Sequence, residues 1–262
     1  MTEEIEGVRD IRAFWNGRSG LGQWAGTRDV TAKQLEMEAI AAFVQDGIRI
    51  LDLGCGNGIT AIELARRHKV DVLGIDFAEE MVAAAVGLAK GQELKGSVNF
   101  RTGNVEDLAS LGEFDLIYTE RVLINLPDWP TQLKALTNIV GLLSDKGIYV
   151  MCENSQDGLD KINLLRGEVG LPSILAPWHN RYLRDSELQE VSFDNVHLED
   201  IIYYSSTYYF ISRVVNAWLA SQEGVEPDYD APINQLALRL PSIGDLGQGR
   251  IWVWRKRENS IE

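Results

Sequence analysis

The chain has 262 residues, of which 45% are hydrophobic, so it is long enough to bury a large core without disulfides or structural metals. Its formal charge of −14 disfavours binding to a nucleic-acid backbone, because counterion release drives that binding only on basic surfaces. No apolar run reaches the length needed to span a membrane. These properties favour a protein whose partners are small molecules, with the oligomeric state left open.

The cysteine content and the first residues point to a cytoplasmic location. Cys55 and Cys152 are too few for a disulfide framework or a metal site, which indicates a reducing compartment. Residues 1–10 are acidic and lack an apolar core, unlike a secretory signal peptide. We therefore expect a cytoplasmic protein.

Residues 1–34 are predicted to form an N-terminal lid or arm. Phe14, Trp15 and Trp24 stand among several glycines, a mixture typical of a loop that folds over a ligand. A packed N-terminal arm is the alternative. The sequence Thr31-Ala32-Lys33-Gln34 then resembles a capping box, and the pattern predicts a helix that Gly47 ends.

From residue 48 onward, short apolar strands alternate with amphipathic helices. Strands are predicted at 48–53, 70–75, 98–102, 114–119 and 148–152. Helices are predicted at 59–68, 78–90 and 129–143. This alternation predicts a Rossmann-like, doubly wound α/β fold with a mostly parallel seven-stranded sheet and helices on both faces.

The pattern changes after the fifth strand. Helical stretches are expected near 159–169, 186–191 and 207–220, and strands at 197–204 and 251–255. We interpret residues 155–185 and 205–248 as insertions that build a cap over the carboxyl edge of the sheet. The main domain would then span residues 35–262.

The strongest motif is an apolar strand that runs directly into a glycine-rich turn and a helix. Residues 50–58 read Ile-Leu-Asp-Leu-Gly-Cys-Gly-Asn-Gly, and Asp76 ends the next strand. Glycines let the backbone turn sharply and approach a ligand, and a carboxylate at the second strand end can accept both hydroxyls of a ribose. Asp52 would repel a pyrophosphate, but it suits the ammonium of an amino-acid group.

The stretch 52–58 resembles the first motif of the class I S-adenosylmethionine-dependent methyltransferases, and Gly-Ile-Asp-Phe at 74–77 resembles their second motif. The resemblance extends through 103–107, 114–120 and 142–147. It implies the fold of that superfamily, a methyltransferase activity and S-adenosyl-L-methionine as the cofactor.

The resemblance also implies individual cofactor contacts. Asp52 would approach the methionine end, Asp76 the ribose and Asn104 the adenine, although family members often carry Asp in place of Asn104. The other expected contacts are the backbone-approach residues Gly54 and Gly56, the adenine-flanking Phe77 and Met81, Val105, and also Trp15, Cys55 and Glu120. A helix N-terminus beside Cys55 can lower a thiol pKa, whereas the alternative is a small buried residue.

Polar residues at the strand ends and in the predicted cap are candidates for the acceptor site, because ligands of open α/β sheets bind at that edge. The candidate substrate contacts are Arg121, Asn154, Arg166, Trp178 and Asn180. For Arg166, which shares a helix face with Asn163, a solvated face is the alternative.

Methyl transfer from a sulfonium is an in-line displacement that depends largely on positioning. A hydroxyl acceptor needs a base, and His179 is the candidate, with Glu153 as competitor or orienting group. No carboxylate cluster follows the fourth strand, so metal independence is expected. A polar, sugar-like metabolite methylated at a hydroxyl is the first hypothesis. N-methylation of a small amine and non-catalytic cofactor binding are the alternatives.

Overall fold

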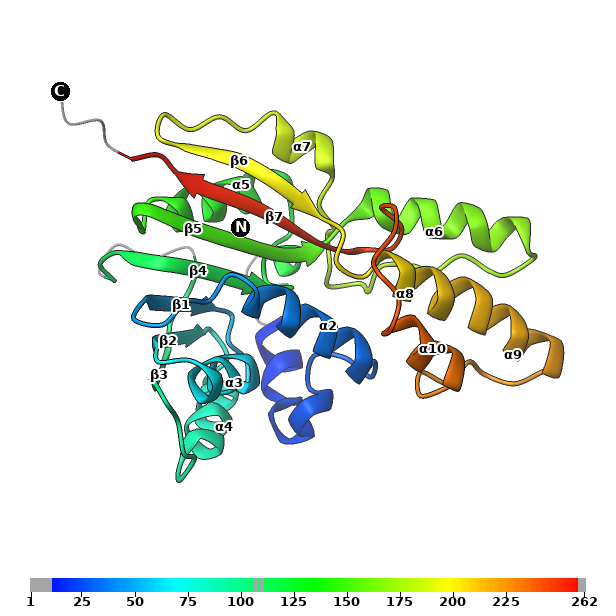
Figure 1. The fold of residues 1–262 in the computed structure, drawn as a ribbon, viewed down its shortest axis with the longest axis horizontal. Coiled ribbons are helices and arrows are strands. Elements are labelled where there is room, and N and C mark those ends of the chain that lie inside the picture. Colours follow the sequence, from blue (N-terminus) through cyan, green and yellow to red (C-terminus); the bar gives the residue numbers. More distant parts are fainter. Residues whose placement is uncertain (1–10, 106–107, 109–110, 259–262) are drawn as a thin grey trace.

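A computed structural model describes residues 11–105, 108 and 111–258 and shows a central sheet with helices on both faces (Figure 1). The sheet has seven strands in the order β3-β2-β1-β4-β5-β7-β6. They are β1 (Arg49–Leu53), β2 (Asp71–Asp76), β3 (Ser97–Thr102), β4 (Phe114–Glu120), β5 (Leu143–Asn154), β6 (Val196–Ile202) and β7 (Gly249–Lys256). Strands β1 to β5 pair in parallel, and β7 runs antiparallel to both β5 and β6. The predicted fold class is confirmed.

Alternate residues of the buried strands supply two apolar cores, one on each face of the sheet. Ile50 packs on the face covered by α2 (Val30–Ala41) and α3 (Ile59–Arg67). Leu51 packs on the opposite face, covered by α5 (Trp129–Val140) and α7 (Asp185–Gln189). A central strand buried on both faces is mostly apolar, which explains Ile50, Leu51 and Leu53, and Asp52 is the one polar residue of this run. The remaining covering helix, α4 (Glu79–Ala89), connects β2 to β3.

Three predicted helix boundaries were wrong, and one of them is the end of α2, which lies at Ala41 rather than at Gly47. Helix α2 begins after Asp29, whose Oδ1 accepts the backbone N–H of Ala32 at 2.9 Å, so the cap precedes the predicted capping box. Helix α5 ends at Val140, and the chain enters β5 at Leu143, which pairs with Phe114 of β4. Residue 143, which the local periodicity assigns to the helix, therefore belongs to β5, because its pairing with β4 outweighs the local helical pattern.

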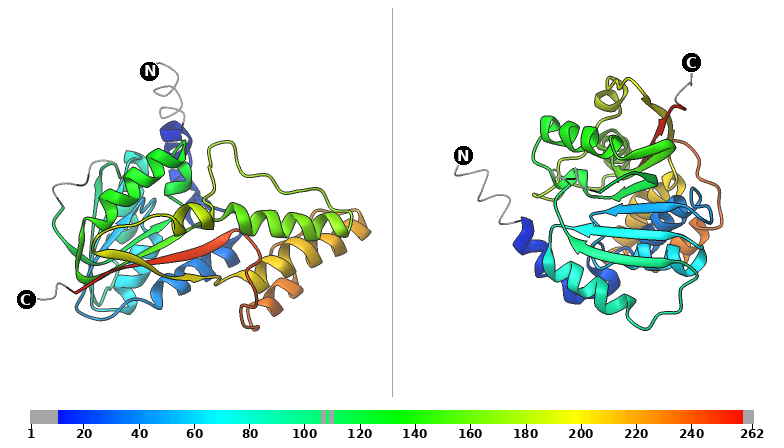
Figure 2. Two further views of the ribbon diagram at one scale, coloured as in Figure 1. Left: turned by 90° about the horizontal axis from the view of Figure 1, so that it is seen from above. Right: turned by 90° about the vertical axis from the view of Figure 1, so that its left-hand side faces the viewer.

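The later helices gather at one end of the sheet. They are α6 (Gln156–Glu168), α8 (Ser206–Phe210), the π-helical η3 (Ile211–Asn216), α9 (Ala217–Glu223) and α10 (Pro232–Ala237). They lie beyond the carboxyl ends of β4 and β5, as Figure 1 and the left view of Figure 2 show. We call residues 155–185 and 205–248 the cap, and we call residues 11–28, which include the 3-10 helix η1 (Ser19–Trp24), the lid.

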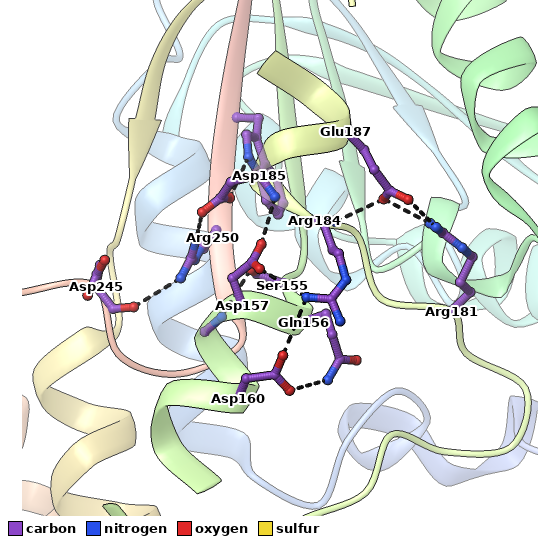
Figure 3. Close-up of polar contacts among 12 residues, drawn as sticks. Ser155, Gln156, Asp157, Asp160, Arg181, Arg184, Asp185, Glu187, Asp245 and Arg250 are labelled. Carbon is purple, nitrogen blue, oxygen red and sulfur yellow. Dashed lines mark hydrogen bonds and ion pairs between the residues drawn. The ribbon is translucent and has the colours of Figure 1, made fainter. Parts of the chain in front are cut away.

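A polar network ties the cap to the sheet (Figure 3). The fully buried Arg250 of β7 pairs with Asp185, which also accepts the indole N–H of Trp252 at 3.1 Å. Asp157 of α6 accepts the backbone N–H of Asp185 at 2.8 Å and pairs with Arg184 at 3.1 Å. The start of α6, the start of α7 and the last strand are thus held together by charged hydrogen bonds.

Within the described part of the chain, no helix combines the length and the apolar character required to cross a bilayer.

Candidate active site

One cavity of about 990 Å³ lies where the carboxyl ends of β1, β2 and β4 meet the lid and the cap. It brings together residues that are far apart in the sequence, from Ile11 to Gln248. The predicted site residues that line it are Trp15, Asp52, Gly54, Cys55, Gly56, Asp76, Phe77, Met81, Asn104, Val105, Glu120, Arg121, Asn154, His179 and Asn180. Every expected cofactor contact therefore faces one space. Glu106 and Asp107, which belong to the 103–107 motif, lie outside the described residues.

The glycine turn after β1 leaves room for a ligand. Gly54 has φ of +72°, and a Cβ there would lie 2.3 Å from Cγ2 of Val122, so only glycine fits. Gly56 has φ of +52°, and a Cβ there would enter open space beside the cavity. The backbone of this turn can therefore come into direct contact with a bound molecule.

Two carboxylates stand at the ends of β1 and β2. Asp76 is fixed, because its Oδ2 accepts the N–H of Gly56 and its Oδ1 accepts the N–H of Ala78, both at 2.8 Å. Asp52 is 2% exposed, and burial raises its pKa to about 8. A bound ammonium would offset the cost of charging Asp52. These two hydrogen-bond acceptors thus fit a ligand with an amino-acid end and a ribose.

Cys55 precedes α3, where a helix N-terminus could lower the pKa of its thiol, but its environment has the opposite effect. Burial raises the pKa of its thiol, and the nearby carboxylates of Asp52 and Asp76 reinforce that rise. The alternative, a small residue that packs in the turn, agrees with this environment.

Glu153 lies under the loop that follows β4, outside the cavity wall. Its side chain accepts the backbone N–H groups of Val122 and Leu123 at 3.0 Å and of Ile124 at 3.4 Å. Burial raises its pKa to about 7, and these backbone donors oppose the rise. The geometry therefore makes Glu153 a support of the loop and corrects its proposed role as a base.

Two expected substrate contacts also lie elsewhere. Arg166 donates to the carbonyl oxygens of Pro172, at 2.8 Å, and Arg213, so it joins α6 to the neighbouring cap segments. Trp178 is 71% exposed and touches the site only through its ring contacts with Phe14 and His179. Neither side chain lines the cavity.

His179 is placed in the cavity wall among aromatic rings. Its ring centroid lies 4.5 Å from that of Phe14, 6.1 Å from Trp15 and 5.2 Å from Trp178. Burial lowers its pKa, and the charge of Arg18 lowers it further. Its Nδ1 is buried and has no hydrogen-bond partner among the described residues. Burial and the charge of Arg18 thus both favour the neutral imidazole.

The sequence analysis missed several charged residues of the cavity. Lys33 and Glu36 of α2 line it, and Lys33 pairs with Glu120, which also accepts the Thr60 hydroxyl at 2.9 Å. Glu36 pairs with Arg121 at 3.2 Å. The signal in the sequence was that charged residues occur on a helix whose other residues are partly apolar and buried. Lys33 was instead interpreted as part of the predicted capping box. The cap adds Tyr182, Tyr209, Arg213 and Gln248.

The lid closes one side of the cavity through backbone groups. The Gly22 carbonyl oxygen accepts the Asn57 amide at 2.7 Å, and the Gly26 carbonyl oxygen accepts the Arg121 guanidinium at 2.8 Å. Trp15 donates to Asn125 Oδ1 at 3.3 Å. Each contact joins the lid to a residue of the cavity wall.

We predict that amide hydrogen exchange in residues 11–28 slows when cofactor and acceptor bind, because ligands in this cavity would stabilise the closed lid. Exchange measured by mass spectrometry on the free and the ligand-bound protein checks this. Peptides from the edge strand β6, none of whose residues lines the cavity, provide the control. Equal exchange of the lid in both samples would favour a permanently packed arm.

The sequence matches the methyltransferase domain family over residues 44–193, which is more than half of the chain. The chain belongs to this family. The predicted superfamily, the class I S-adenosylmethionine-dependent methyltransferases, is confirmed, and so is S-adenosylmethionine as the cofactor.

Three known proteins show the likeness at different levels. The magnesium-protoporphyrin O-methyltransferase of Rhodobacter capsulatus is 40% identical over 81 residues, 30% of this chain and 34% of its own length. The ubiquinone biosynthesis O-methyltransferase of Acinetobacter baylyi is 36% identical over 96 residues, 36% and 40% of the two chains. The magnesium protoporphyrin IX methyltransferase of Synechocystis PCC 6803, solved with bound SAH, superposes with a TM-score of 0.57 at 15% identity, covering 87% and 85%.

This chain therefore spans less than half the length of these two sequence relatives, and the solved structure supports the fold. Within residues 11–105, 108 and 111–258, no three His, Cys, Asp or Glu side chains are grouped as a metal site.

Proposed function

We propose that this protein transfers a methyl group from S-adenosylmethionine to a hydroxyl of a polar small molecule. The carrying observation is that His179, half-buried and with an Nδ1 atom that has no hydrogen-bond partner among the described residues, lines the same cavity as the glycine turn and Asp76. The family membership and the O-methyltransferase relatives support the reaction class.

Different residues of the cavity would bind the cofactor and activate the acceptor. Asp76 would accept the ribose hydroxyls, Asp52 the ammonium of the methionine part, and the turn around Gly56 would approach the cofactor through its backbone. When bound, S-adenosylmethionine supplies a methyl group on a sulfonium, which is an excellent leaving group. His179 would take the proton from the acceptor hydroxyl as that oxygen attacks. The lid would exclude water from this space.

The two alternatives make different demands on the same cavity. A neutral amine needs positioning without a base, so turnover of an amine acceptor would not depend on His179. A non-catalytic cofactor-binding protein would release no S-adenosylhomocysteine with any acceptor. Release of S-adenosylhomocysteine measured across a panel of hydroxyl and amine metabolites tests the proposal, and no release with any panel member would favour the binding protein.

S-adenosylmethionine is expected to raise the midpoint of thermal unfolding, since it binds only the folded protein. Asp76→Ala is expected to weaken that binding about 10–100-fold, because the variant loses charged hydrogen bonds to the cofactor. Isothermal titration calorimetry on both proteins measures the effect. Asp71→Ala, at the opposite end of the same strand, is the matched control, since Asp71 bonds only to Ser97 among the described side chains. Equal affinity in Asp76→Ala and wild type would remove Asp76 from the cofactor site.

A further inference from the structure

The charges of the cavity wall contrast with those of the whole protein. Although the chain carries a formal charge of −14, five cationic and four acidic side chains of the described residues line the cavity. The cations are Arg12, Arg18, Lys33, Arg121 and Arg213, and the acids are Glu36, Asp52, Asp76 and Glu120. Two of the acids, Asp52 and Asp76, stand in the proposed cofactor site. The remaining wall, where the acceptor would lie, is therefore rich in positive charge.

Arg121 occupies a strained position that directs its side chain to this wall. It has φ of +60°, a left-handed conformation that is uncommon for a residue other than glycine and is concentrated at functional sites. Its guanidinium donates to the Gly26 carbonyl oxygen and pairs with Glu36, but its buried Nε finds no partner in the described part of the chain. Glu36 is only 3% exposed, and burial raises its pKa while the charge of Arg121 opposes that rise.

Arg213 faces the same wall from the cap. Its guanidinium lies 5.0 Å from the ring centroid of Tyr209 and 4.6 Å from that of Tyr229, and it pairs with Asp29 at 2.5 Å. Asp29 also accepts the Tyr208 hydroxyl at 2.7 Å and the N–H of Ala32, so its charge is shared among three donors.

The two arginines act on a common surface. Burial raises the pKa of both Tyr182 and Tyr209, and the guanidinium groups of Arg121 and Arg213 each oppose that rise at both tyrosines. Tyr182 and Tyr209 line the cavity. Arg121, directly after β4, and Arg213, from η3, line the same cavity as these two tyrosines, and the Arg213 guanidinium lies over the Tyr209 ring.

We propose that the methyl acceptor is an anion, and that Arg121 and Arg213 receive its carboxylate or phosphate group beside Tyr182 and Tyr209. A planar guanidinium fork matches either anion with paired, charge-assisted hydrogen bonds. This inference specifies the substrate class of the proposed function. It concerns binding alone, so it can be tested without turnover.

The test is isothermal titration calorimetry on the protein saturated with S-adenosylhomocysteine, with benzoate, phenyl phosphate and benzamide as probes. At least one of the anions is expected to bind about tenfold or more tightly than the uncharged benzamide, and the tighter anion identifies the group received. Arg213→Gln is expected to weaken anion binding about 10–100-fold and to leave benzamide unchanged, because it removes the charge but keeps a donor for Asp29.

The controls separate this proposal from the proposed function. Arg239→Met removes an exposed arginine after α10 and is expected to change no affinity. If Arg213→Gln does not fold, Arg213→Met combined with Asp29→Asn removes both charges of the buried pair and keeps an N-cap for α2. The inference is overturned if the wild type binds the anions and benzamide equally, or binds none of the probes. It is also overturned if the folded variant keeps the anion affinity of the wild type. Absence of S-adenosylhomocysteine binding would instead count against the proposed function.

Discussion

Replacement of His179 by phenylalanine is expected to lower kcat by about 10²–10⁴-fold, the usual contribution of a general base, with little change in cofactor affinity. Phenylalanine keeps the ring contacts with Phe14, Trp15 and Trp178, so the loss reports the missing nitrogen rather than a cavity. Initial rates with the acceptor found in the metabolite panel, and calorimetry with S-adenosylhomocysteine, measure the two effects.

The pH profile distinguishes a base from a packing residue. A base must be unprotonated, so activity should be constant above the pKa of His179 and fall as the pH drops through it. Burial and Arg18 lower that pKa below its ordinary value of 6.5, so the acid limb belongs below pH 6.5. This limb should vanish in His179→Phe.

His68 follows α3, near the start of β2, and does not line the cavity. His68→Phe should therefore keep both the turnover rate and the acid limb of the pH profile. Near-normal turnover with an unchanged acid limb in His179→Phe would point to an acceptor that needs no base.

Arg250→Met is expected to lower the free energy of unfolding by about 2–3 kcal/mol, because it removes a fully buried guanidinium together with its ion pair to the partly exposed Asp185. Arg250 is fully buried, pairs with Asp185 and donates to the Asp245 carbonyl oxygen at 3.0 Å. Urea unfolding at constant pH measures the loss as a lower midpoint with an unchanged slope.

The same strand offers a matched control. Arg255 pairs with Glu199 at 2.7 Å, but both side chains are more than a third exposed, so Arg255→Met should cost about 0–1 kcal/mol. Addition of Asp185→Asn to Arg250→Met should recover part of the lost stability, since it removes the unpaired charge. If the two single variants lose equal stability, the network in Figure 3 does not hold the cap to the sheet.

The sequence by itself determined the fold class and the cofactor class, and it predicted which residues of the cavity contact the cofactor. Both depend on contiguous segments: the apolar strand from Ile50, the turn through Gly58 and the strand end at Asp76. The period of apolar residues specifies each strand or helix, and parallel strands linked by helices bring their carboxyl ends to one edge. The expected cofactor contacts therefore all line one cavity.

Only the tertiary structure decided the roles of the polar residues outside those segments. Glu153 and Asn154 are neighbours at the end of β5, and a strand alternates its side chains, so Asn154 reaches the cavity while Glu153 supports the loop beneath it. Arg166 and Arg213 both belong to cap helices, yet the packing of α6 against η3 buries the first and directs the second to the wall. Local sequence does not encode which face of a cap helix meets the sheet edge, because that depends on contacts between residues far apart in the chain.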